Sequence, residues 1–128
     1  MKRTKNDEHF VSMIIKNIDY ILSILEGVDF ETFSGNQMMS DSTVFRLVQI
    51  SEHCSGLSEE FKETVNYDWF MVTGMRNRLV HDYGNVDFGI VYSTAKKDLP
   101  MLRSILNDWM ATKYLIPTGS CSAEDTPF

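Results

Sequence analysis

A short stretch near the middle of the chain, residues 73–84, gathers side chains that could act on a phosphate ester. They are Arg76, Asn77, Arg78, His81, Asp82 and Tyr83. Arginine carries a permanent positive charge on a planar fork that can hold two phosphate oxygens at once. Histidine can take up or release a proton near neutral pH, and asparagine and tyrosine add hydrogen-bonding groups. This combination of residue types predicts phosphate chemistry.

The spacing of these residues on a helix decides which of them could act together. Arg76 and Tyr83 are predicted to lie within about 20° of each other on one face, whereas His81 lies about 140° round the helix from Arg76. We expect Gly84 and Asn85 to end the helix, since both tolerate the left-handed conformation. A loosened last turn could swing the His81 ring toward Arg76. Alternatively, two copies of this helix end could face each other in a dimer and share one cleft.

The remainder of the chain predicts an all-α scaffold, an antiparallel bundle of four or five helices. Apolar residues recur at three- and four-residue steps, and no stretch alternates as a strand would. The first helix is expected over residues 7–26, ending at Gly27, and the second from a cap at Ser40, Asp41 or Ser42 to about Gly56. A short helix is expected to begin at Ser58. A further helix should run from a cap at Asn66, Tyr67 or Asp68 into the motif, and the last should begin at Asp87. These elements form one domain, residues 1–116, followed by a disordered tail at residues 117–128.

Several positions between these helices carry expectations of their own. Phe30 and Phe33 are expected in a loop that covers the bundle, before a turn at residues 34–36. Pro100 is expected either to kink the last helix or to open a new one, because proline cannot donate a backbone hydrogen bond. Glu52 is expected to be a solvated carboxylate, although it could orient the reacting groups. Lys96 is also expected in solvent.

The motif and its flanks resemble a known superfamily. Residues 74–83, followed by Val86-Asp87 and by Asp98-Leu99-Pro100, are similar to the HEPN superfamily and within it to the HepT-like toxins. The pattern of that group is an arginine, four to six residues, a histidine, and a tyrosine two residues later. Arg76, His81 and Tyr83 occupy these three positions, and the resemblance extends from about Ile14 to Met110.

The resemblance implies a metal-independent endoribonuclease, the toxin of a type VII-like toxin–antitoxin pair, that forms a homodimer and uses no cofactor. Its substrate would be RNA, with tRNA and mRNA as the candidate classes, cut by attack of the 2′-hydroxyl to leave a 2′,3′-cyclic phosphate and a 5′-hydroxyl. His81 would act as base or acid and Arg76 would hold the phosphate, with Asn77 and Arg78 in support. The resemblance also implies that a nucleotidyltransferase antitoxin silences the enzyme by adenylylating Tyr83.

The overall charge argues against a general nucleic-acid binder. The formal net charge is −6 and the sequence pI is about 4.9, whereas nucleic-acid-binding proteins usually carry a basic surface. Arg76 and Arg78 from two subunits could still provide a local positive potential. We therefore expect weak and salt-sensitive RNA binding.

No metal site or membrane segment is predicted. Cys54 and Cys121 have no metal-ligand spacing with each other or with the three histidines, and Cys54 fits the buried stripe of its helix. The N-terminus does not resemble a signal peptide, and no apolar run approaches the roughly 20 residues that cross a bilayer. The cytoplasm is the expected compartment.

A second class of function fits the same residues. The chain could be a non-catalytic HEPN module that binds a nucleotide or a nucleotidyltransferase partner. Arginine and histidine near a helix C-terminus also stabilise the helix dipole, by about 0.3–1 kcal/mol, without any catalytic role. The acidic composition favours the binding module, and the complete Arg76, His81 and Tyr83 pattern favours the ribonuclease.

Overall fold

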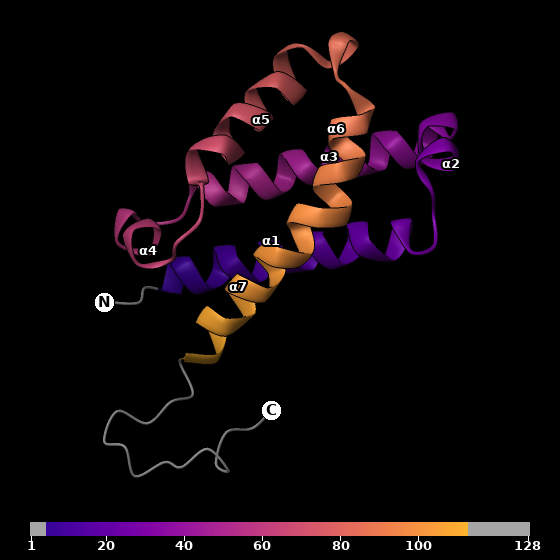
Figure 1. Ribbon diagram of the computed structural model, residues 1–128. Coiled ribbons are helices and arrows are strands. Elements are labelled where there is room, and N and C mark those ends of the chain that lie inside the picture. The colour runs from indigo at the N-terminus through magenta and orange to yellow at the C-terminus, as the bar shows by residue number, and fades with distance from the viewer. Residues whose placement is uncertain (1–4, 113–128) are drawn as a thin grey trace, which may run out of the picture.

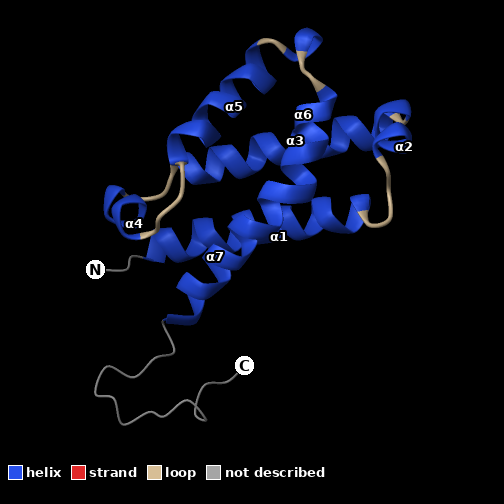
Figure 2. Cartoon of the chain, in the orientation of Figure 1, coloured by secondary structure: helices blue, strands red, loops and turns tan. Residues whose placement is uncertain are grey.

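The computed structural model describes residues 5–112, and all of their regular secondary structure is helical (Figure 1, Figure 2). The longer elements are α1 (Lys5–Leu25), α3 (Gln37–Ser55), α5 (Trp69–His81) and a rod built from α6 (Phe88–Ser93), the π-helical turn η2 (Thr94–Asp98) and α7 (Leu99–Ala111). Shorter elements connect them: α2 (Phe30–Gly35), α4 (Glu59–Thr64) and the 3-10 turn η1 (Tyr83–Asn85). The predicted all-α bundle is confirmed. The predicted tail at residues 117–128 lies outside the described residues.

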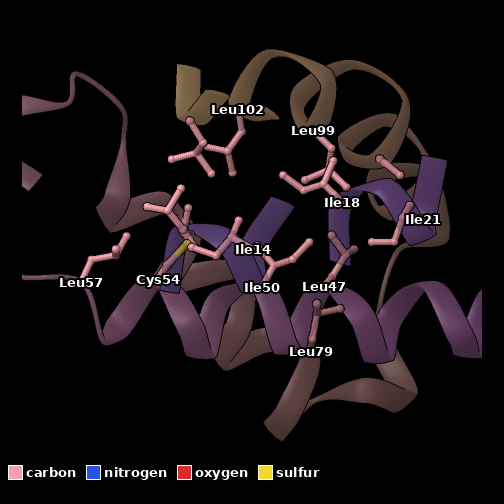
Figure 3. Close-up of a cluster of buried hydrophobic side chains, with 14 of the residues drawn as sticks. Ile14, Ile18, Ile21, Leu47, Ile50, Cys54, Leu57, Leu79, Leu99 and Leu102 are labelled. Carbon is pink, nitrogen blue, oxygen red and sulfur yellow. The ribbon is translucent and has the colours of Figure 1, made fainter. Parts of the chain in front are cut away.

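The core forms where α1 and α3 run antiparallel beside each other (Figure 1). Ile14, Ile18 and Ile21 of α1 are fully buried among apolar residues of α3 and α7, such as Leu47 and Leu102 (Figure 3). Burying one such side chain contributes about 1.5–3 kcal/mol. The sequence spacing of the apolar residues on α1 therefore fixes the face on which the other helices pack.

Helix α3 lies between two partners, because α1 contacts it on one side and α5 on another. Leu79 brings α5 onto α3 in the region of Leu47 (Figure 3). Helix α5 has no comparable contact with α1, and the rod of α6, η2 and α7 crosses the bundle to pack on α1 (Figure 1). The motif helix is thus attached to the core mainly through α3.

The predicted start of α3 is wrong. The helix begins at Gln37, three to five residues before the expected caps, because Asn36 accepts a hydrogen bond from the backbone N–H of Met39 at 3.0 Å. The Ser40 hydroxyl instead donates to the backbone carbonyl of Asn36 at 3.3 Å, within the helix. Asp41 is therefore an exposed residue of the second turn and has no capping role.

The predicted loop at Phe30 and Phe33 is also wrong, since both residues lie in α2. Asp29 caps this helix by accepting from the backbone N–H of Thr32 at 2.8 Å, which lowers the pKa of the Asp29 carboxyl. Phe33 is fully buried, whereas Phe30 is 42% exposed and packs edge-on against Tyr92. The two phenylalanines cover the bundle as expected, but a short helix holds them.

The rod passes Pro100 without breaking. The backbone N–H of Leu99 donates to the carbonyl of Thr94, five residues earlier, so a π-helical turn leads into α7 and Pro100 stands in the first turn of α7. Lys96, expected in solvent, donates from Nζ to the backbone carbonyl of Leu25 at 2.6 Å. It therefore supplies the positive charge that the last turn of α1 lacks.

Within residues 5–112, no helix is both long enough and apolar enough to span a membrane.

Candidate active site

Helix α5 carries most of the motif and ends earlier than predicted. Asp68 caps its start, as one of three expected positions, and the backbone N–H of Asp82 closes its end on the carbonyl of Arg78 at 3.0 Å. Gly84 follows in η1 and does not adopt a positive φ; among the described glycines only Gly27, which ends α1, does so. The helix is regular up to His81, so the loosened last turn considered from sequence does not occur.

Arg76 is held from two sides between α5 and α3. Its Nη2 donates to Oε2 of Glu52 on α3 at 3.0 Å, and its Nη1 donates to Oδ1 of Asn77 at 3.2 Å. The Nε atom is buried and has no hydrogen-bond partner within residues 5–112. The side chain nevertheless remains 32% exposed, so its outer edge is open to a ligand.

Glu52 pairs with Arg76 in this site, although its side chain remains 47% exposed to solvent. It borders a hollow of about 240 Å³ between α3 and α5, which is lined by Ser51, Glu52, Ser55, Thr73, Arg76 and Asn77. Hydroxyl, carboxylate, amide and guanidinium groups therefore surround one small space. Sequence spacing gives no indication of this pair, because its two members belong to different helices.

His81 does not join Arg76 within one chain. It is the last residue of α5 and is exposed, and it has no hydrogen bond or ion pair to any residue in the described range 5–112. Because the helix stays regular, the two side chains leave α5 about 140° apart. The structure of one chain therefore presents the guanidinium and the imidazole in separate surroundings.

Tyr83 lies on neither of these surfaces. Its hydroxyl donates to Oδ1 of Asp41 near the start of α3, and its ring packs edge-on against Phe88. The predicted shared face with Arg76 is wrong, because α5 has ended before Tyr83. The Tyr83 hydroxyl and the Arg76 guanidinium are bound to Asp41 and Glu52. These two α3 residues are three helical turns apart, about 16 Å along the helix axis.

The Asp41 carboxylate changes the acidity of Tyr83. By accepting the hydrogen bond of the neutral phenol it raises the pKa of Tyr83 to about 12, with smaller contributions from burial and from the negative charge itself. From the sequence, Asp41 was expected only as a possible cap of α3. No spacing rule could have found this pair, since 42 residues separate the two partners.

Arg78 points to a third surface, a groove between α5 and the rod. The groove has two sections, of about 250 and 280 Å³, and Met75, Arg78 and Ile90 line both of them. Arg78 is exposed and has no ion pair with a residue that the structure describes. The groove is also lined by Asp68, Asp82, Asp87 and Asp98, and it is separate from the surface that holds Arg76 of the same chain.

The buried thiol has no part in any of these sites. Burial raises the pKa of Cys54 to about 12, so this side chain packs as a small hydrophobic residue, as expected. In the described part of the chain, no three His, Cys, Asp or Glu side chains gather closely enough to hold a metal ion.

Comparison of the sequence with models of known protein families identifies the family of this chain. The model of the family described as "Ribonuclease HepT-like" matches residues 14–108, which is most of the chain and includes all of α3, α5 and α6. The chain belongs to the HepT-like ribonuclease family. No solved structure gives a significant match.

Two curated relatives match this chain along most of their own length. A protein of Caldanaerobacter subterraneus subsp. tengcongensis named "Putative RNase TTE0752" is 27% identical over 99 residues, 77% of this chain and 88% of the relative. A protein of Thermococcus cleftensis named "Probable ribonuclease HepT" is 27% identical over 104 residues, 80% of this chain and 93% of the relative. Membership of the family makes RNA the implied substrate class.

Proposed function

We propose that this HepT-like protein is a metal-independent endoribonuclease in which Arg76 and His81 act on the scissile phosphodiester. Family membership supports the reaction class. The observation that carries the assignment is the Arg76 guanidinium, which Glu52 and Asn77 hold in a fixed orientation at the mouth of a polar hollow. A guanidinium held in this way can bind phosphate oxygens without first losing side-chain freedom.

The proposed reaction needs no atom beyond those of the RNA and two protein groups. A base takes the proton of the 2′-hydroxyl, the 2′-oxygen bonds to phosphorus, and the bond from phosphorus to the 5′-oxygen breaks as an acid protonates that oxygen. His81 supplies proton transfer, which contributes about 10²–10⁴-fold to a rate. Arg76 stabilises the charge that builds on the phosphorus-bound oxygens. Asn77 fixes Arg76, and Arg78 attracts the RNA backbone.

A homodimer would bring together what one chain keeps apart. Phe70, Gly74, Asn77 and His81 follow each other at steps of four, three and four residues, so they form one stripe on the outward face of α5. Phe70 is 86% exposed, and a Cβ added to Gly74 would meet no atom of this chain within 4 Å. An apolar ring beside a bare stretch of backbone suits close packing against a second α5. We propose this stripe as the dimer contact.

RNA cleavage by the purified chain tests the assignment. The wild type is expected to cleave single-stranded RNA in excess EDTA and to leave 2′,3′-cyclic phosphate ends. His81→Ala and Arg76→Ala should each lower the rate by at least about 100-fold without loss of helix content. Lys97→Ala, a change at an exposed cation of the rod, is the control and should cleave normally. Cleavage that depends on added metal would overturn the mechanism.

We further propose that the chain is the toxin of a type VII-like toxin–antitoxin pair and that a nucleotidyltransferase antitoxin adenylylates Tyr83. The hydroxyl is accessible, since Tyr83 is 40% exposed. An AMP group there adds bulk and negative charge two residues from His81, where it would oppose a substrate phosphate. Co-expression with such an enzyme should add AMP mass to Tyr83 and abolish cleavage. Label on another residue would refute this switch.

One observation favours a second function, a non-catalytic helical module that binds a nucleotide or a nucleotidyltransferase. The net charge of −6 disfavours RNA binding. If purified dimer binds the partner enzyme but leaves RNA intact under all the conditions above, the binding module is the better description.

A further inference from the structure

Asp41 and Tyr83 form a pair that joins η1 to α3. Asn36 already caps α3, and Asp41 stands in the second turn of the helix on an exposed position. Its carboxylate nevertheless reaches across to η1 and accepts the hydrogen bond of the Tyr83 hydroxyl. A carboxylate aimed at a hydroxyl is the arrangement by which a general base activates an oxygen nucleophile.

We propose that Asp41 is the general base for modification of Tyr83, so that the protein itself activates the hydroxyl that a nucleotidyltransferase labels. The inference rests on the proposed role of Tyr83 as the AMP acceptor and adds a residue to it. Asp41 contacts the reacting oxygen directly. It therefore belongs to the chemistry of the modification and not to that of RNA cleavage.

The step balances with a nucleoside triphosphate as the second reactant. The phenolic oxygen of Tyr83 forms a bond to the α-phosphorus, and the bond from that phosphorus to the pyrophosphate oxygen breaks. The electron pair of the broken bond leaves with pyrophosphate. The phenolic proton passes to Oδ1 of Asp41 and then to solvent.

The surroundings of Tyr83 leave room for such a reactant. A hollow of about 330 Å³ adjoins the hydroxyl, and Asp41 is the one charged residue among its described lining, which comprises Ser34, Gln37, Ser40, Asp41, Tyr83, Gly84 and Phe88. The nearby carboxylates are engaged elsewhere: Asp82 accepts from the side chain of Asn85 and Asp87 from the backbone of Gly89, each at 2.8 Å. Within the described residues, Asp41 is thus the carboxylate hydrogen-bonded to this phenol.

The acidity of Tyr83 explains why a base is required. With a pKa of about 12, the phenol supplies almost no phenolate at neutral pH. The same carboxylate that disfavours free phenolate can accept the proton while the oxygen attacks. Without Asp41 the phenol should return toward its ordinary pKa of about 10 and react only as phenolate.

A chemical AMP donor tests the base without any partner enzyme. The full chain is incubated with adenosine 5′-phosphorimidazolide, which transfers AMP to a phenol with loss of imidazole, and AMP on each tyrosine peptide is followed by mass spectrometry. Tyr20, 43% exposed, serves as the internal reference for the 40% exposed Tyr83. The variant Asp41→Asn keeps a hydrogen-bond acceptor of the same shape but cannot take a proton. Asp19→Asn, a change at another helix-surface carboxylate, is the matched control.

At pH 7 we expect Tyr83 of the wild type and of the control variant Asp19→Asn to be labelled at least about 10-fold faster than Tyr83 of Asp41→Asn, with the labelling of Tyr20 unchanged. From pH 7 to 10 the rate for Asp41→Asn should rise steadily as phenolate forms, while the wild-type rate stays nearly level. If Asp41 had only a structural role, the labelling rate of Tyr83 would depend on pH in the same way in the wild type and in Asp41→Asn.

Three results would overturn the proposal: equal labelling of Tyr83 in wild type and Asp41→Asn, faster labelling in Asp41→Asn, or labelling of Tyr20 but not of Tyr83 in the wild type. Faster labelling would make Asp41 a group that shields the hydroxyl. Because no nucleotidyltransferase is present, failure of such an enzyme to modify Tyr83 counts against the proposed switch alone.

Discussion

At the scale of single residues, the ion pair between Arg76 and Glu52 has more consequence for orientation than for stability. The two side chains are 32% and 47% exposed, and such pairs contribute only about 0.2–1 kcal/mol because solvent screens them. Their geometry is nevertheless specific, since Asn77 holds the second nitrogen of the same guanidinium. Glu52 is thus a positioning residue for Arg76.

The change Glu52→Gln tests this role. We expect the free energy of unfolding to fall by less than about 1 kcal/mol, whereas kcat for RNA cleavage falls about 10-fold because Arg76 loses its fixed orientation. KM should not rise, since the positive charge of Arg76 remains. Urea unfolding and steady-state kinetics separate the two effects. If Glu52→Gln has the wild-type kcat, Glu52 does not position Arg76 for catalysis.

At the scale of elements, α5 is shaped by two demands. Its inner face, with Val72 and Leu79, holds it on α3, while its outward face carries an exposed phenylalanine and a glycine in mid-helix. Glycine in the middle of a helix costs about 1 kcal/mol relative to alanine. Among the described residues, no atom of a neighbouring element lies within 4 Å of a Cβ added at position 74, and the proposed dimer contact would account for a glycine there.

Substitutions at Gly74 separate helix stability from assembly. Gly74→Ala is expected to raise the stability of the dilute monomer by about 1 kcal/mol, and Gly74→Leu should leave a folded chain that no longer dimerises. Thermal unfolding and sedimentation velocity measure the two properties. Ser104→Leu, which adds the same side chain at an exposed position of α7, is the control and should dimerise normally. A dimeric Gly74→Leu would place the contact elsewhere.

At the scale of the whole molecule, the separation of Arg76 from His81 has a direct consequence for the assembly. One chain holds the guanidinium on the α3 side of α5 and the imidazole at the exposed helix end. Under the proposed mechanism, a complete site needs Arg76 of one protomer and His81 of the other. The dimer is therefore part of the catalytic proposal and not an addition to it.

Mixing inactive variants tests this arrangement. Arg76→Ala and His81→Ala, each inactive alone, should regain about a quarter of wild-type activity when unfolded and refolded together in equal amounts, because half of the dimers are mixed and each mixed dimer has one intact site. RNA cleavage measures the recovery. A mixture of His81→Ala with itself is the control. No recovery, despite mixed dimers detected by mass spectrometry, would place both groups within one chain.

Local patterns in the sequence determined the helical class and the main helices, and they singled out the residues that we propose to be reactive. Periodic apolar positions such as Ile14, Ile18 and Ile21 specify a buried face by geometry alone. The ends of helices are also locally encoded, since Gly27 ends α1 with a positive φ and the Asp68 side chain caps the start of α5. The errors at α2 and at the start of α3 are local too. Asp29 and Asn36 are ordinary capping residues whose role sequence analysis missed.

Tertiary structure alone decided which of those residues meet. The pairs Arg76–Glu52 and Tyr83–Asp41 join residues 24 and 42 positions apart, and they depend on how α5 lies across α3. One ideal helix was expected to continue through Tyr83, but Asp82 ends α5, so Tyr83 turns to the other end of α3. The spacing of residues along the sequence gives only the direction in which each side chain leaves its own helix. The distance between helices follows from the packing of the whole core, which no single segment contains.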